Sequence, residues 1–328
     1  MDQRWKGMKL GCINAKGWEV GKLEDIGCEL NSGSLDSVGL TEAIKENKSK
    51  KAMSVCCERG VKRDGCMKIG CLNVRGWGIG KLDDLSRELN EWNLDIVGLT
   101  ETHLRDRVLE EGFDYVMVCK GRCKQERMGG GVALLYRKER NFVFEEVDIG
   151  NSAMSEDILV MKVECMDTER KKVKMIIAVA YMTVESERGR RENVDKYKIM
   201  KNIIREYNGE NVIVMGDMNG HIGLLGERIN QNGEMLIEFT DEMGLENLNE
   251  TLAKGRVTWC VRGQESAIDY MIVNGKMREI VNSMWIDEDG WIDIVSDHNM
   301  LVAECRLYGR AEKKVKVEKR KWKLRNAN

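Results

Sequence analysis

The sequence predicts an α/β fold in which two packed β-sheets are flanked by helices. Many apolar runs of strand length follow one another along the chain, and a few longer segments repeat apolar residues at helical spacing. Several of the apolar runs end in carboxylate, amide or imidazole side chains. These polar groups would project from strand ends, so the pattern that predicts the fold also indicates one site gathered from several strands.

The first predicted unit is a strand, a glycine-rich loop, a helix and a second strand. Residues 67–73 form the first strand, and residues 81–90 form a helix because their leucines recur every three or four positions. Residues 94–100 form the next strand, which ends at Glu101.

After Glu101 the pattern is mostly strands. Further strands are predicted at residues 115–119, 131–136, 158–163, 173–181, 212–215, 267–273 and 300–305. Two more helices are predicted, at residues 193–207 and 232–243. The apolar faces of these helices consist of Val194, Tyr197, Met200, Ile203 and Ile204 in the first, and of Leu236 and Phe239 in the second.

An internal repeat divides the chain. Residues 8–42 match residues 67–101 without a gap at more than half of the positions. Only the second copy runs on into further strands, so residues 66–308 are interpreted as the working domain. Residues 1–65 are interpreted as a partial tandem duplicate followed by a charged linker, and we expect them to be dispensable for folding.

The charge is balanced over the whole chain but not at its end. The 328 residues carry a formal net charge of −2, which gives no global field for a polyanionic partner. Residues 309–328 form a basic tail in which nearly half of the residues are Lys or Arg. Such a tail can hold nucleic acid through phosphate contacts or serve as a solvated linker, and the sequence favours neither.

The sequence indicates a nuclear or cytoplasmic protein that is neither secreted nor bound to a membrane. No apolar run reaches the ~18 residues of a membrane span, and the first residues lack the apolar stretch of a signal peptide. The eleven cysteines are an odd number without zinc-ligand spacing, which is typical of reduced thiols.

The polar strand ends match the needs of phosphate-ester hydrolysis. Asp217 and Asn219 are two residues apart after an apolar run, so an extended chain points both the same way, although a simple turn is the alternative. His298 is poised for proton transfer, and Asp269, inside an apolar strand, needs a buried partner that this histidine would supply. A carboxylate such as Glu101 can hold the divalent cation that neutralises a phosphate.

The order of these motifs resembles a known superfamily. Its members share residues corresponding to Asn73, Glu101, Tyr181, Gly216-Asp217-x-Asn219, Thr258-Trp259, Ile268-Asp269-Tyr270 and Ser296-Asp297-His298. This set resembles the endonuclease/exonuclease/phosphatase superfamily, and most of all the endonuclease domain of non-LTR (RTE- or LINE-like) retrotransposons and the craniofacial development protein 2-like proteins.

The resemblance implies a four-layer α-β-β-α sandwich, as in DNase I, and Mg2+-dependent nicking of double-stranded DNA by a monomer, with Mn2+ as an alternative ion. Glu101 and Asn73 would bind the metal, with Asp297 nearby. Asp217 would activate the attacking water, and Asn219 would hold the phosphate.

The remaining roles concern charge and DNA. The resemblance implies that His298, paired with Asp269, stabilises the developing charge, and that Tyr181 contacts the phosphate or assists the leaving group. Thr258 and Trp259 would lie at a DNA-facing rim, with Arg75 also on the substrate side.

Two positions depart from the superfamily pattern. Arg75 stands where abasic endonucleases usually carry a carboxylate, and Thr183 stands where a proline is common. We expect Thr183 to loosen the loop that carries Tyr181. Two other functions stay open. A phosphomonoesterase acting on inositol phosphates or nucleotides would use the same fold and catalytic set, and the duplicated start and the complete lack of proline favour an inactive retrotransposon-derived remnant.

Overall fold

The computed structural model describes residues 66–308 except for residues 79, 123–128, 141, 151–154, 168, 170 and 293–295. The predicted duplicate at residues 1–65 and the basic tail at residues 309–328 lie outside the described residues, so both stay predictions. Among the described residues, no helix is long and apolar enough to cross a membrane.

The first sheet has seven strands in the order β14-β15-β1-β2-β5-β4-β3. These strands are β1 (Met67–Asn73), β2 (Ile96–Thr100), β3 (Val108–Glu111), β4 (Tyr115–Lys120), β5 (Val132–Arg137), β14 (Val281–Ile286) and β15 (Leu301–Cys305). Only β1 and β2 pair in parallel within this sheet, and the helix α3 (Lys81–Glu91) connects them.

The second sheet follows the same plan. Its order is β10-β13-β9-β8-β7-β16, with β6 also paired to β7. These strands are β6 (Val143–Glu146), β7 (Ile158–Asp167), β8 (Lys172–Tyr181), β9 (Asn211–Asp217), β10 (Glu246–Asn247), β13 (Asp269–Val273) and β16 (Leu307–Tyr308). Its one parallel pair is β8 and β9, which the helix α4 (Glu187–Glu206) connects.

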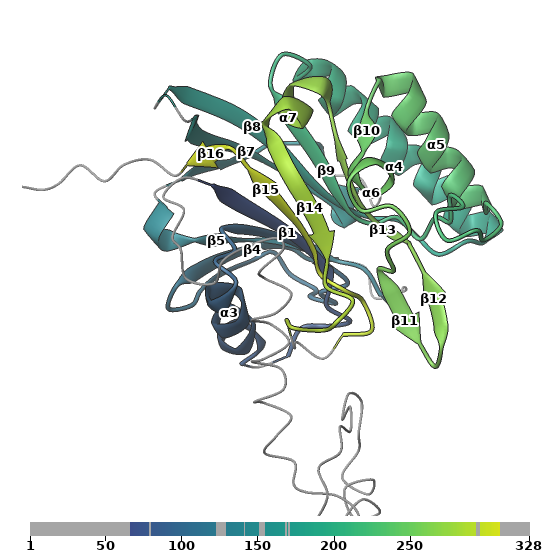
Figure 1. The fold of residues 1–328 in the computed structure, drawn as a ribbon, viewed down its shortest axis with the longest axis horizontal. Helices are drawn as coiled ribbons and strands as arrows, with labels where there is room; N and C mark the ends of the chain where they lie inside the picture. The colour runs from purple at the N-terminus through teal and green to yellow at the C-terminus, as the bar shows by residue number, and fades with distance from the viewer. Residues whose placement is uncertain are drawn as a thin grey trace, which may run out of the picture.

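The two sheets lie face to face with helices on both outer surfaces. Helix α3 covers the outside of the first sheet, whereas α4 and α5 (Gln231–Met243) cover the outside of the second (Figure 1). The short helices α6 (Leu248–Thr251) and α7 (Gly275–Ile280) accompany the second sheet. A separate hairpin of β11 (Trp259–Val261) and β12 (Gln264–Ser266) projects beyond β13. This arrangement confirms the predicted α-β-β-α sandwich of two mostly antiparallel sheets.

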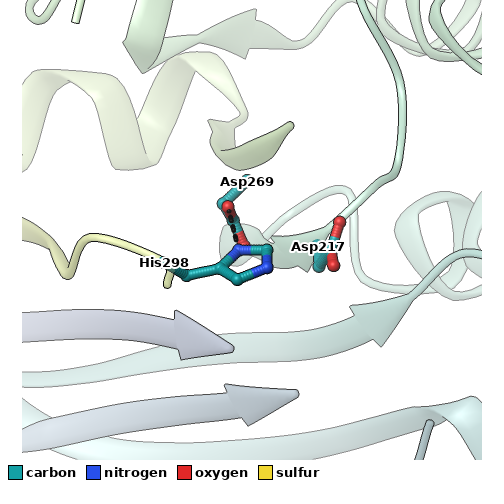
Figure 2. Close-up of side chains that lie close together, drawn as sticks. All are labelled: Asp217, Asp269 and His298. Carbon is teal, nitrogen blue, oxygen red and sulfur yellow. Dashed lines mark hydrogen bonds and ion pairs between the residues drawn. The ribbon is translucent and has the colours of Figure 1, made fainter. Parts of the chain in front are cut away.

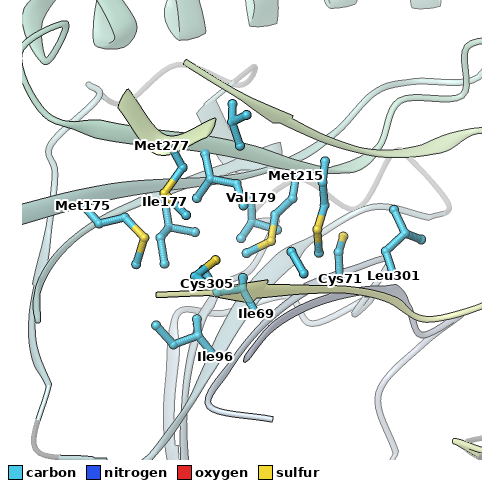
Figure 3. Packing of buried hydrophobic residues seen from close by; sticks show 14 of the residues in the cluster. Ile69, Cys71, Ile96, Met175, Ile177, Val179, Met215, Met277, Leu301 and Cys305 are labelled. Atoms are coloured by element: carbon cyan, nitrogen blue, oxygen red, sulfur yellow. The ribbon is translucent and has the colours of Figure 1, made fainter. Parts of the chain in front are cut away.

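The main core fills the space between the sheets (Figure 3). Side chains alternate along each strand, so every second residue enters this core. Ile69 and Cys71 of β1 therefore meet Ile177 and Val179 of β8 and Met215 of β9. The same alternation continues past the last apolar residue of each strand, and this sets the direction of the polar residue that follows.

The sequence places helix α4 six residues too late. The helix begins at Glu187, where the Ser186 hydroxyl caps it by accepting a hydrogen bond from the Gly189 N–H at 2.9 Å. Its first turns bury the polar side chains of Glu192, Asn193 and Lys196, which hydrophobic periodicity cannot detect. Val194, predicted on the apolar face, is instead 39% exposed.

The strands that the sequence analysis missed are mostly short or at edges. Strands β3 and β6 expose alternate side chains and contain two glutamates each, so their apolar signal is weak. Strand β14 is also at an edge of its sheet. The remaining missed strands, β10, β11, β12 and β16, have only two or three residues.

Candidate active site

The polar residues predicted at strand ends point into one space between the two sheets. Asn73 continues the inward face of Ile69 and Cys71, and Asp217 continues that of Ile213 and Met215. Both parallel pairs, β1 with β2 and β8 with β9, end at this edge of the sandwich. Asn73 lies opposite Thr100 in the first pair, and Tyr181 lies opposite Asp217 in the second.

Asp217 and Asp269 form the centre of the site. They are direct partners across the antiparallel β9–β13 ladder, and both are almost fully buried. Burial and the facing carboxylate of Asp269 raise the pKa of Asp217 to about 7. Two donors orient the Asp217 carboxylate: the Asn73 amide at 2.9 Å and the Asn219 backbone N–H at 2.9 Å.

His298 completes this centre. Its Nδ1 lies 2.8 Å from Oδ2 of Asp269, and Figure 2 shows the imidazole ring between the Asp269 and Asp217 carboxylates. Burial would lower the pKa of His298, but the adjoining Asp269 outweighs it and raises the pKa to about 9. One ligand atom from each of the three residues lies within 4.8 Å of the other two. The structure thus contains a buried cluster of two carboxylates and one imidazole.

Asp297 lies beside this cluster and is held by two predicted substrate residues. Its Oδ2 accepts hydrogen bonds from Nη1 of Arg75 at 2.9 Å and from Nε1 of Trp259 at 3.0 Å. Its Oδ1 is 4.0 Å from Nε2 of His298. Arg75 and Trp259 are therefore brought to the site, where each contacts a carboxylate of the chain itself.

Thr258 is not at an exposed rim. Its side chain is fully buried, and its hydroxyl accepts hydrogen bonds from the backbone N–H groups of Ile268 and Asp269 at 2.9 and 3.0 Å. These bonds fix the start of β13 and hence the position of the Asp269 side chain. In this structure Thr258 supports the site from inside, which corrects the predicted place at the rim.

Glu101 and Tyr181 meet at the other side of the site. Glu101 has a left-handed backbone with φ of 52°, and its carboxylate lies 3.7 Å from Nε2 of His103. Burial and the neighbouring carboxylates of Glu101 and Asp217 raise the pKa of Tyr181 well above its usual range. The buried phenol is therefore protonated at neutral pH.

Asn219 is held by the chain on both sides. Its backbone is left-handed with φ of 46°, and its side-chain Nδ2 donates to the Met182 carbonyl at 2.8 Å. Its own carbonyl accepts from Nδ2 of Asn232 at 3.0 Å. The side chain thus ties the end of β9 to the segment that follows Tyr181.

The segment after Tyr181 is not loosened by Thr183, contrary to our expectation. The Thr183 N–H donates to Oδ1 of Asn193 at 2.8 Å, a bond that proline cannot make. Its carbonyl accepts from Nδ2 of both Asn193 and Asn232, at 2.8 and 3.0 Å. Its hydroxyl donates to Glu192 at 2.9 Å and accepts from Lys196 at 3.1 Å. Side-chain bonds from α4 and α5 here replace the rigidity of a proline ring.

Sequence reasoning missed a buried charge cluster behind Tyr181, which we call the triad: Arg122, Asp157 and Lys196. Its members lie far apart in the sequence, and none belongs to a recognisable motif. The only local signal is Lys196 in the apolar repeat of α4, at a position that faces the protein interior.

The donor chemistry of the site fits a hard divalent cation. Oδ1 of Asp269 and Oδ1 of Asp297 are buried, and within the described part of the chain neither accepts a hydrogen bond. Buried carboxylate oxygens without donors are costly unless a cation neutralises them. Oxygen atoms of Glu101, Asn73 and Asp297 are of the type that Mg2+ prefers.

The two packed sheets with helices on both outer surfaces define an α/β sandwich of the DNase I-like fold class. Residues 175–302 match the family described as Endonuclease-reverse transcriptase. No curated protein matches the chain.

Solved structures share the fold at low identity. The endonuclease domain of TRAS1, a telomere-specific non-LTR retrotransposon, has a TM-score of 0.57 at 16% identity, over 74% of this chain and 98% of that domain. The catalytic domain of APE2 from Xenopus laevis has a TM-score of 0.57 at 18% identity, over 76% and 94%. A 3′ phosphatase from Neisseria, solved with product DNA, has a TM-score of 0.56 at 16% identity, over 73% and 99%.

The chain is similar to the endonuclease/exonuclease/phosphatase superfamily and to retrotransposon endonucleases, as the sequence motifs predicted. The further resemblance to craniofacial development protein 2-like proteins stays a prediction.

Proposed function

We propose that this protein is a Mg2+-dependent endonuclease that hydrolyses phosphodiester bonds in double-stranded DNA. The observation that carries the proposal is the bond between Asn73 and Asp217, which brings the polar ends of both sheets to the buried Asp217–Asp269–His298 cluster. The family match and the DNA-processing enzymes that share the fold support the substrate class.

Each residue has a role that its contacts support. Asp217 takes the proton of the attacking water, because Asn73 and Asn219 orient its carboxylate and its pKa of about 7 suits a base at neutral pH. Asp269 fixes the His298 ring through Nδ1, which leaves the Nε2 proton to stabilise charge on a phosphate oxygen.

Three further residues act around the phosphate. The protonated Tyr181 hydroxyl contacts a phosphate oxygen or assists the leaving oxygen, and Asn219 positions the phosphate from the end of β9. Trp259 lies half-buried beside Asp297, and its ring offers a surface at the DNA side of the site.

A divalent cation bound by Glu101, Asn73 and Asp297 would neutralise charge on the phosphate. Mg2+ is the proposed ion and Mn2+ the alternative. The protein is expected to act as a monomer in the nucleus or cytoplasm.

The test is nicking of supercoiled plasmid by the full chain, with Mg2+ and with EDTA. We expect Mg2+-dependent nicking that Asp217→Asn and His298→Gln each lower by at least about a hundredfold. Asp84→Asn is the matched control, because Asp84 is an exposed carboxylate on α3.

Nicking that survives in EDTA, or that Asp217→Asn leaves unchanged, would contradict the proposal. Well-folded protein without nicking would direct attention to phosphatase activity, for which 3′-phosphorylated DNA and inositol phosphates are the substrates to compare. An inactive remnant would cleave none of them.

A further inference from the structure

The triad behind Tyr181 has no role in the proposed reaction so far, although it is almost completely buried. Asp157 is 1% exposed, and the Lys196 side chain is fully buried. Burying three charged groups is costly, so such a cluster persists only where it is fully hydrogen-bonded. The bonds of the triad show which parts of the chain it joins.

Asp157 is the hub of the triad. Its Oδ1 accepts from Nε of Arg122 at 2.6 Å, and its Oδ2 accepts from Nη2 of Arg122 at 2.5 Å. It also accepts from the Gly131 N–H at 3.3 Å and pairs with Nζ of Lys196 at 2.6 Å. Burial by itself raises the pKa of Asp157, but the two cations hold that pKa below its usual value. The single ionised carboxylate of Asp157 therefore joins three segments: α4, the glycine run at residues 129–131 before β5, and the segment after β4.

Both cations of the triad reach Tyr181. Nζ of Lys196 donates to the Tyr181 carbonyl at 2.8 Å and lies 5.6 Å from the centre of the phenol ring. The Arg122 guanidinium lies 5.7 Å from the same centre. The ring is thus contacted by two cations, whereas its hydroxyl end lies near Glu101.

Arg122 also fixes the backbone that lies against the Tyr181 hydroxyl. Its Nη1 donates to the Gly129 carbonyl at 2.6 Å. A Cβ atom at Gly129 would lie 3.5 Å from the Tyr181 hydroxyl oxygen and 3.9 Å from Oε1 of Glu101. Gly129, Gly130 and Gly131 all have left-handed φ angles, of 84°, 80° and 82°. The glycine run can therefore pack closely between Arg122 and the phenol.

We propose that the triad is a positioning device for Tyr181: Asp157 holds Arg122 and Lys196 so that they fix the phenol ring and its hydroxyl against the reacting phosphate. The effect of the triad on catalysis rests on the proposed function. That the triad fixes the position of the Tyr181 ring can be tested whether or not the proposed function holds. Arg122, Asp157 and Lys196 are positioning residues that act only through Tyr181.

The first variant is Arg122→Lys, which keeps the charge but loses the two-pronged contact with Asp157. Its matched control is Arg140→Lys. Arg140 donates through Nε to the buried carboxylate of Asp95 at 2.6 Å. Asp95 directly precedes β2, so this contact lies at the end of β2 that is remote from the site.

The second variant, Gly130→Ala, displaces Arg122 without removing a charge. A Cβ atom at Gly130 would lie 2.1 Å from the guanidinium carbon of Arg122. Its control is Gly150→Ala, because Gly150 has nearly the same φ, 78°, but a Cβ there meets no described atom within 4 Å. Backbone strain is therefore matched between these two variants, and only one of them moves the triad.

The experiment measures the ring directly and the reaction separately. The seven tyrosines are replaced by 3-fluorotyrosine, and the Tyr181 resonance in the 19F spectrum is assigned by its loss in Tyr181→Phe. We expect Arg122→Lys and Gly130→Ala to shift or broaden this resonance, and their controls to leave it unchanged.

We also expect Arg122→Lys to lower kcat about tenfold with KM changed less than about twofold. In a Tyr181→Phe background Arg122→Lys should have no further effect on kcat.

A Tyr181 resonance that is the same in both test variants as in the wild type would overturn the proposal. So would equal changes in the test and control variants, or an effect of Arg122→Lys that adds fully to that of Tyr181→Phe. If the resonance moves as expected but the protein cleaves no phosphate ester, the positioning role stands and the proposed function fails.

Discussion

The Asn73 side chain donates a hydrogen bond of 2.9 Å to the Asp217 carboxylate, although 144 residues separate them. Asn73 ends β1 of the first sheet and Asp217 ends β9 of the second, so this bond joins the two sheets at the edge where the site lies. A second contact strengthens the same junction, because the Ser296 hydroxyl donates to the Asn73 carbonyl at 2.6 Å and accepts from the His298 N–H at 3.1 Å. Asp217, His298 and Asn73 are thus fixed relative to one another by hydrogen bonds that involve the neutral groups of Asn73 and Ser296.

The pair of His298 and Asp269 should make the stability of the protein depend on pH. The folded-state pKa of His298 is about 9, above the ordinary value of about 6.5. The folded protein binds this proton more tightly, so the stabilisation is complete below pH ~6.5 and is lost as the pH rises through about 9. We expect the stability difference between wild type and His298→Asn to shrink by about 2 kcal/mol from pH 7 to pH 9.5.

Urea unfolding in EDTA at several pH values measures this difference. His103→Gln is the control, because the His103 side chain is partly exposed and its Nε2 lies 3.7 Å from the Glu101 carboxylate, not against a buried aspartate. A difference that is constant over the whole pH range would show that the His298–Asp269 pair is not charged in the folded state.

Glu101→Gln should raise the concentration of Mg2+ needed for half-maximal nicking by about tenfold or more, because an amide attracts a divalent cation less than a carboxylate does. Part of the rate should return at saturating Mg2+. The Mg2+-induced rise in Tm gives a second measure that does not depend on turnover. Glu111→Gln serves as the control, because Glu111 is an exposed carboxylate at the end of the edge strand β3, where it pairs with Lys138. An unchanged Mg2+ requirement in Glu101→Gln would remove Glu101 from the proposed metal ligands.

Thr183→Pro restores the residue that is common in the superfamily, yet we expect it to destabilise this protein by about 1–3 kcal/mol. Proline removes the N–H that the buried Asn193 side chain accepts, and it also removes the hydroxyl between Glu192 and Lys196. Thr183→Ser keeps all of these groups and should stay within about 0.5 kcal/mol of the wild type. Thermal and urea unfolding give both values. A proline variant as stable as the wild type would mean that the side-chain network around Thr183 contributes little.

Arg75→Gln should weaken DNA binding and lower its salt dependence. The Arg75 side chain is 58% exposed at the edge of the site, where it can exchange Asp297 for a phosphate. Losing one phosphate contact lowers the slope of log affinity against log salt by about one. Fluorescence anisotropy in an Asp217→Asn background measures the affinity and its salt dependence, with Arg87→Gln on the exposed face of α3 as control. Equal slopes for wild type and Arg75→Gln would leave Arg75 only its contact with Asp297.

The sequence predicted the layers of the fold and most of the residues that the structure brings together at the candidate site. Strand alternation is a local property, so the direction of Asp217 after Ile213 and Met215, and of Asp269 before Met271, follows from the sequence. The start of α4 was missed for the opposite reason. The first turns of α4 are buried through polar contacts to distant residues, and hydrophobic periodicity cannot predict such contacts.

By itself, the sequence determined which side chains leave each strand end and that their chemistry suits phosphate-ester hydrolysis. Only the tertiary structure decided which strand ends meet, and it therefore gave Thr258 a buried supporting place, paired Arg75 with Asp297 and assembled the triad behind Tyr181. These contacts join residues that lie far apart along the chain. They depend on sheet order and packing across the core, which local propensities do not encode.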